Sequence, residues 1–245
     1  KSAASVTQPN VEKTAPQHSI IENRGQFTQE ADFVVNAKDR TVYFSKDAVQ
    51  IALKGGAIFE LGFGKSPIPL NWSGLEASGT TFNYCSGEAE TWILGATGWS
   101  SISTPVRPGV NLVFQFKDER LKYSYEIDPG VAPEDLLVHF PGADLVTVLE
   151  SGGISIEKDS SQIIDRAPIA WQIAPEGRRE VEVQFHLIPG TTSARLVVGD
   201  FDPTLPLTVD PEMVLFCGFI GGELDEQIRG LDVDADGNVF VAGFA

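Results

Sequence analysis

The stretch that decides the fold is residues 107–143, RPGVNLVFQFKDERLKYSYEIDPGVAPEDLLVHFPGA. Apolar and polar residues alternate in it twice, on either side of the charged turn 117–120. The residues expected on the buried face are Val110, Leu112, Phe114 and Phe116 before the turn and Leu121, Tyr123, Tyr125 and Ile127 after it. Because successive side chains of a strand point to opposite faces, this pattern predicts a half-buried antiparallel hairpin. Pro129-Gly130 ends its second strand, and Leu136, Val138 and Phe140 begin a third.

Short apolar segments separated by turn residues extend this pattern along the chain. The further strands predicted are 32–37, 41–45, 48–53, 57–63, 144–149, 153–157, 169–173, 179–188, 194–199 and 206–210. Lys54-Gly55-Gly56 and Ser151-Gly152-Gly153 are predicted hairpin turns, and residues 64–105 read as a looser segment rich in Gly, Ser and Thr. Many short strands without intervening amphipathic helices predict an all-β, β-sandwich-like domain.

Composition narrows the classes of function. The formal net charge is −16, which argues against nucleic acid as a partner because phosphates would be repelled. No run of 18 apolar residues is present, so we expect no transmembrane segment. A hydrophobic content of 42% is enough for a packed core. We expect a soluble protein exposed to solvent and to divalent cations.

The composition changes twice along the chain. Residues 1–16 are small, polar and without a period, and they predict a flexible leader. Residues 17–211 hold the predicted strands of the all-β domain. Residues 212–245 read as strand, acidic turn, strand, tight turn, strand, and stop before completing a sheet of ordinary size.

The last segment resembles a known repeat. Gly221-Gly222, Asp225, Leu231-Asp232-Val233-Asp234 and Gly237-Asn238-Val239-Phe240-Val241-Ala242-Gly243 are similar to part of an SBBP (seven-bladed β-propeller) repeat of bacterial surface proteins. Upstream, Glu22-Asn23-Arg24-Gly25-Gln26 resembles the ENxGQ opening of the uncharacterised domain that precedes such repeats. Further landmarks follow in the same order, among them Asn83-Tyr84, Gly87, Trp92, Pro108-Gly109, Asp128-Pro129-Gly130, Trp171-Gln172 and Val209-Asp210-Pro211.

This resemblance covers about residues 20–245 and carries expectations about setting. It implies a secreted or bacterial cell-surface protein, an all-β module ahead of a β-propeller, and no enzymatic activity. The expected partners are other domains of the same longer chain or other copies of it.

The two cysteines, Cys85 and Cys217, have two interpretations. Their spacing fits neither a zinc knuckle nor a CxxC redox pair. They are either two buried thiols acting as small hydrophobic residues or one disulfide of a secreted protein. Both depart from the family pattern, which favours the disulfide slightly.

Two groups of residues are candidate binding sites. Trp72, Trp92 and Trp99 fall in the looser segment, where they either form a carbohydrate-stacking platform or cover the core. Asp232, Asp234 and Asp236 alternate ahead of Gly237 like the first half of a calcium loop. The acid usual at its twelfth position is replaced by Gly243, so a plain hairpin turn is the competing interpretation.

No residue set points to catalysis. The sequence holds no G-x-S-x-G elbow, and His18, His139 and His186 have no zinc-binding spacing. Abundant carboxylates leave a carboxylate-based hydrolase as an alternative. The expected function is therefore a non-enzymatic structural or adhesive module that assembles through its strand edges, with a carbohydrate-binding module as the main alternative.

Overall fold

The structure is a computed structural model. It describes residues 19–37, 40–54, 56–65, 69–117, 120–134, 136–211, 213–214, 227–233 and 239–244. The predicted leader, residues 1–16, lies outside the described residues. The chain divides into two compact units, 1–215 and 216–245, and none of the described segments forms a helix long and apolar enough to cross a membrane.

The hairpin predicted from the sequence is confirmed. Strands β8 (Val110–Lys117) and β9 (Arg120–Ile127) pair in antiparallel register, with Phe114 opposite Tyr123. Leu112, Phe114, Tyr123 and Tyr125 are all buried. Alternation therefore identified the core-facing side of both strands.

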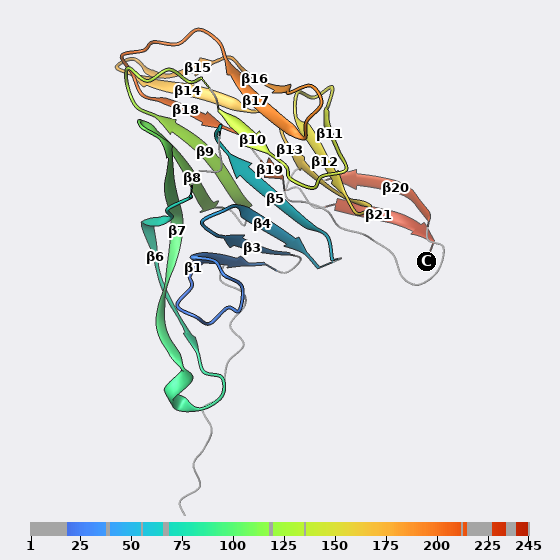
Figure 1. The fold of residues 1–245 in the computed structure, drawn as a ribbon. Coiled ribbons are helices and arrows are strands. Elements are labelled where there is room, and N and C mark those ends of the chain that lie inside the picture. The colour runs from blue at the N-terminus through green and yellow to red at the C-terminus, as the bar shows by residue number, and fades with distance from the viewer. Residues whose placement is uncertain are drawn as a thin grey trace, which may run out of the picture. The chain divides into compact units, whose positions relative to one another are not determined.

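Most strands of the first unit form one 15-stranded sheet in the order β15-β14-β18-β9-β8-β7-β1-β2-β3-β4-β5-β10-β17-β16, with β6 paired to β7 (Figure 1). Every pairing is antiparallel, which confirms the all-β class. The remaining strands of this sheet are β1 (Ile20–Glu22), β2 (Phe33–Asn36), β3 (Arg40–Phe44), β4 (Val49–Leu53), β5 (Ile58–Phe63), β6 (Ser73–Tyr84), β7 (Ile93–Arg107), β10 (Leu137–His139), β14 (Ile169–Ala174), β15 (Gly177–Val181), β16 (Val183–Leu187), β17 (Ser193–Val198) and β18 (Leu207–Asp210).

The sheet folds back on itself, so that its two halves share one core. Phe114 of β8 packs edge-to-face on Phe44 of β3, with ring centroids 5.0 Å apart. Phe63 of β5 packs on Tyr123 of β9 at 5.8 Å. Strands far apart in the sheet thus face each other across a layer of aromatic rings, as in a β-sandwich.

One predicted strand divides where the sheet turns a corner. Residues 179–188 alternate like a single strand, but they belong to β15 and β16, which meet at Glu182 and lie at opposite ends of the sheet. The Glu182 carbonyl still accepts a hydrogen bond from the Gly199 amide at 2.8 Å. A segment that passes in this way from one end of a folded sheet to the other forms a corner of the sandwich.

A second, four-stranded sheet has the order β11-β12-β13-β19. Its strands are β11 (Leu145–Val148), β12 (Ile154–Lys158), β13 (Ser161–Asp165) and β19 (Met213–Val214). The predicted turn at Ser151-Gly152-Gly153 joins β11 to β12, and the Leu149 amide donates to the Gly153 carbonyl at 2.8 Å.

In the C-terminal unit, β20 (Gln227–Val233) pairs with β21 (Val239–Phe244) in antiparallel register, with a bulge between Ile228 and Gly230. The two predicted strands match this pair, and the predicted turn between them lies outside the described residues. Within the described residues the unit forms this single pair and no propeller.

Candidate functional site: a projecting arm and a groove over β17

The longest strands among the described residues form a hairpin in the segment that the sequence marked as loose. β6 has 12 residues, β7 has 15, and the short 3-10 helix η1 (Ala89–Thr91) lies between them. Residues 101–107 of β7 pair with β8, and Trp99 and Gly98 pair with β1. Beyond Gly98 the described pairing of β7 is with β6 alone, and Figure 1 shows this end extending away from the sheet. We call residues 73–107 the arm and residues 85–92 its tip.

Two glycines let the strands of the arm carry large rings. A Cβ atom on Gly74 would lie 2.4 Å from the indole of Trp99, and one on Gly98 would lie 2.8 Å from the ring of Phe82. Each ring therefore covers a glycine of the facing strand, an arrangement that compensates for the missing side chain.

Bulges interrupt the outer edge of the arm. The β6–β7 register shifts between Gly74 and Glu76 and again between Ala77 and Thr81. At the shift between Ala77 and Thr81 the Thr80 amide donates to the Ser78 hydroxyl at 3.3 Å. Bulges of this kind prevent a long continuous pairing with another strand, which matters because β6 carries only one charged residue, Glu76.

The tip is an ordered turn whose side chains face solvent. Every residue from Cys85 to Trp92 is exposed. The Thr91 hydroxyl donates to the Ser86 carbonyl at 3.0 Å, and the Trp92 indole N–H donates to the Gly87 carbonyl at 3.3 Å. Trp92 remains 44% exposed, and the neighbouring Leu94 of β7 is 59% exposed. The tip thus holds an apolar ring in a fixed position beside Glu88 and Glu90.

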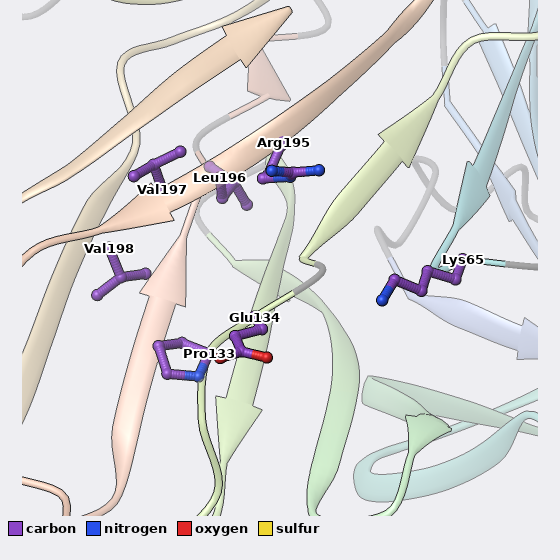
Figure 2. Close-up of a pocket in the computed structure, with 7 residues that line it drawn as sticks. All are labelled: Lys65, Pro133, Glu134, Arg195, Leu196, Val197 and Val198. Atoms are coloured by element: carbon purple, nitrogen blue, oxygen red, sulfur yellow. The ribbon is translucent and has the colours of Figure 1, made fainter. Parts of the chain in front are cut away.

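A groove of about 420 Å³ lies elsewhere in the same unit, over β17 (Figure 2). Its lining is apolar along one side, with charged side chains around it. The lining residues are Lys65, Pro133, Glu134, Arg195, Leu196, Val197 and Val198. In Figure 2 the side chain of Arg195 projects from β17 and that of Lys65 from the segment that follows β5. Among these lining residues Lys65 and Arg195 are cationic and Glu134 is acidic.

The sheet face beside this groove is held together by a histidine. In β10, His139 lies opposite Gly62 of β5 and Ser193 of β17. Its Nε2 lies 2.6 Å from the Gly64 carbonyl oxygen and its Nδ1 lies 2.8 Å from the Ser193 hydroxyl. Because a carbonyl only accepts, Nε2 carries the proton, and in neutral imidazole Nδ1 accepts from Ser193. The three strands are thereby cross-linked next to Lys65 and Arg195.

Comparison with known proteins places the chain in a family without assigning it an activity. The family model described as a domain of unknown function, DUF7948, matches residues 20–212. The chain belongs to the DUF7948 family. No curated protein and no solved structure matches it. The match agrees with the expected uncharacterised domain over nearly the whole of the first unit.

The structure separates the three tryptophans predicted for carbohydrate stacking in the DUF7948 domain. Trp72 is a core residue: its ring packs edge-to-face on Phe44 and Phe114, and its Nε1 donates to the Ser45 carbonyl at 2.8 Å. Its assignment to a stacking platform was wrong, because burial leaves no ring face for a sugar. Trp99 is partly buried over Gly74. Trp92 alone of the three is exposed, and its carbohydrate role stays a prediction.

The other predicted site residues are only partly among the described residues. Cys85 is an exposed free thiol at the tip of the arm, and Cys217 lies outside the described residues, so the disulfide stays a prediction. Asp232 belongs to β20, whereas Asp234 and Asp236 lie outside the described residues. Among the residues that are described, no three acidic, histidine or cysteine side chains form a group able to hold a metal ion.

The DUF7948 domain also contains a buried polar pair that sequence reasoning missed. The Tyr123 hydroxyl donates to Asp165 Oδ2 at 2.7 Å, and Asp165 is fully buried. Burial, and to a smaller extent the charge of Asp165, raises the pKa of Tyr123 well above its ordinary value. Since neither group reaches solvent, the pair joins β9 to β13 and is not available to a substrate. The two residues are 42 positions apart, and nothing in the sequence alone indicates that they are in contact.

Proposed function

We propose that this chain is a non-enzymatic structural module that associates with other copies of itself through its arm. The observation that carries the proposal is the tip of the arm. Trp92 in the tip and Leu94 next to it, 44% and 59% exposed, are held outside the core at the end of a hairpin. Exposed apolar side chains on a rigid support are typical of protein interfaces, where tryptophan is enriched.

The order of the tip supports an interaction role. Hydrogen bonds from Thr91 and Trp92 fix the turn before any partner binds. A preorganised binding element loses less conformational entropy on association than a flexible loop does. The bulges of β6 argue that the contact uses these side chains and not a continuous strand pairing.

The proposed setting follows from the resemblance to bacterial proteins that carry SBBP repeats. In that setting the module lies at the cell surface ahead of a β-propeller, and contacts between modules join neighbouring chains. Protease treatment of intact cells tests the location, since a surface protein is cleaved without lysis. Protection of the chain in intact cells would reject this setting.

Sedimentation velocity over a concentration series tests the association. The full chain is expected to sediment as larger species at higher concentration, and the double variant Trp92→Ser/Leu94→Ser is expected to remain monomeric. Ile173→Ser is the matched control, because Ile173 is also 59% exposed and lies on β14, outside the arm. A full chain that stays monomeric at the highest concentration reached would refute the proposal, and so would equal association of the double variant.

A further inference from the structure

Strand β15 forms one end of the large sheet, and among the described strands it pairs with β14 alone. Its residues Gly177, Arg178, Arg179 and Glu180 are all exposed. Figure 1 shows β15 and the tip of the arm at opposite ends of the first unit. An exposed strand edge is a template for another strand, because it presents a row of outward N–H and C=O groups.

The turn before β15 decides which of its backbone groups point outward. Ala174 of β14 pairs with Gly177 across a loop of two residues. A two-residue hairpin loop closes on a hydrogen-bonded pair, and such pairs alternate along an antiparallel ladder. The backbone groups of Arg179 therefore face β14, whereas the N–H and C=O groups of Arg178 and Glu180 point to the free edge.

The two outward residues carry opposite charges. The Arg178 guanidinium carbon lies 4.0 Å from the centroid of the Trp171 ring, which holds the cation beside the edge without neutralising it. Glu180 forms no ion pair among the residues that the structure describes. We propose that β15 of one copy pairs in antiparallel register with β15 of a second copy. This inference rests on the proposed function and names a second contact of the assembly that the arm begins.

One register satisfies both the hydrogen bonds and the charges. Hydrogen bonding requires that an outward residue of one copy lies opposite an outward residue of the other. Arg178 opposite Glu180 of the second copy gives two opposite-charge pairs, related by a two-fold axis through Arg179. Sliding one copy by two residues places Arg178 or Glu180 opposite itself, and like charges directly opposite each other destabilise a sheet. The edge is therefore complementary to itself, and such an isologous contact joins two copies.

The two-fold axis brings the two Arg179 residues together, and a carboxylate accompanies each of them. Hydrogen bonds from Thr204, and to a smaller extent the charge of Arg179, lower the pKa of Asp202. Asp202 is therefore ionised at neutral pH, within electrostatic range of Arg179. Its negative charge offsets part of the repulsion between the two guanidinium groups.

The contact is small, so it acts together with the arm. Each copy supplies the outward groups of only two residues, and exposed ion pairs add little to affinity. These gains must offset the freedom that two molecules lose on binding, so β15 alone is not expected to hold two copies together. Copies joined through their arms carry several such edges in one species, and several weak contacts formed together raise avidity by about 10²–10⁴. The Trp92→Ser/Leu94→Ser variant is therefore still expected to be monomeric.

A cross-link at the axis tests the register. In the full chain with Cys85→Ser and Cys217→Ser, Arg179→Cys places a thiol opposite the same thiol of the second copy. Opposed residues of a non-hydrogen-bonded pair have Cα atoms about 4.5 Å apart, within disulfide range, so mild oxidation is expected to give a reducible dimer. Glu180→Cys in the same background is the matched control. Its two Cα atoms would be diagonal neighbours, about 7–8 Å apart, and no dimer is expected. Equal cross-linking of the two variants, or none with Arg179→Cys, would overturn the inference.

A charge swap gives a second measurement without cysteine chemistry. Arg178→Glu turns both opposite-charge pairs into like-charge pairs, and it is expected to raise the apparent dissociation constant of the assembly about tenfold. Arg178→Glu/Glu180→Arg keeps the composition and net charge of the unmodified chain and restores both pairs, so it is expected to recover association. A double variant as weak as Arg178→Glu would overturn the inference.

Sedimentation velocity of these variants also separates this inference from the proposed function. If Arg178→Glu associates like the unmodified chain while Trp92→Ser/Leu94→Ser does not, the β15 contact is excluded and the proposed function survives. If the unmodified chain is monomeric, both fail.

Discussion

Tyr123 offers a quantitative test of the core, because its ionisation is coupled to folding. The side chain is 1% exposed and donates to Asp165 at 2.7 Å. Burial and the charge of Asp165 raise its pKa well above the ordinary value. In the folded chain Tyr123 therefore stays neutral in alkali, whereas in the unfolded chain it ionises near pH 10.

The sign of the pH effect follows from the protons bound by each state. Above about pH 10 the unfolded chain holds fewer protons than the folded chain, so the free energy of unfolding falls as pH rises. The stabilisation is complete below the unfolded pKa and is lost above it. For one tyrosine the loss is about 1.4 kcal/mol at pH 11. Tyr125, whose pKa burial also raises, adds a similar loss.

Tyr123→Phe isolates the contribution of Tyr123. At pH 7 the variant should be less stable by about 1–3 kcal/mol, because a buried Asp165 oxygen loses a donor. At pH 11 the difference should shrink by about 1.4 kcal/mol, since phenylalanine has no proton to lose. Urea unfolding at pH 7, 9 and 11, followed by tryptophan fluorescence, measures both quantities. Parallel stability curves for the two proteins would show that Tyr123 ionises normally in the folded chain and would refute the reasoning.

Three further substitutions test the packing. Phe114→Ala should cost about 3–5 kcal/mol in urea unfolding, since it removes the ring that contacts Phe44 and Tyr123; a cost below about 1 kcal/mol would contradict its central place. Gly153→Ala should cost about 1–3 kcal/mol in thermal unfolding, because a Cβ atom would lie 2.5 Å from the Asp165 carbonyl oxygen, and an unchanged melting temperature would count against this packing. Asn23→Ala should raise amide hydrogen exchange in residues 24–31, because the Asn23 side chain bonds backbone groups there; unchanged exchange would show that the loop holds its own shape.

The sequence predicted best the strands that bury one face. In β8 and β9 alternation is regular, and the expected side chains of Leu112, Phe114, Tyr123 and Tyr125 are buried. In a strand with one solvent-exposed and one buried face, apolar residues recur at every second position. This alternation is visible without any knowledge of the neighbouring strands. Hairpin turns were predictable for the same reason, since the chemistry of residues such as Gly152 is local.

The arm was not predicted because its sequence shows little apolar alternation: β7 buries alternate residues, but Gly98 and Thr104 are among them. In β6 most residues are exposed and none is buried, so polar and small residues occupy both sides and leave no period to detect. The two strands are stabilised by each other and by rings over Gly74 and Gly98. Such support depends on contacts between residues far apart in sequence, which periodicity does not report.

The alternation of apolar and polar residues likewise did not predict which strands pair with each other. Residues 179–188 alternate without a break, yet β15 pairs with β14 and β16 pairs with β17. Alternation reports which side of a strand is buried, and it does not report which neighbours supply the hydrogen bonds. The two ends of the large sheet were therefore read as one element.

The landmarks that suggested a family have a physical role beside the arm, next to its tip. Asn23 donates to the Ala31 carbonyl at 2.7 Å and accepts from the Gly25 amide at 3.0 Å, which fixes the loop between β1 and β2. In that loop Phe27 packs edge-to-face on Tyr84 of β6, with ring centroids 5.5 Å apart.

The motif near the start of the domain thus supports the hairpin that begins some fifty residues later. Gly87 and Trp92, two further landmarks, are joined by a hydrogen bond at the tip. These landmark residues therefore hold one exposed turn in place and do not build the core. A fold that fixes an exposed turn so fully is consistent with a tip that binds a partner, because preorganisation lowers the entropic cost of association.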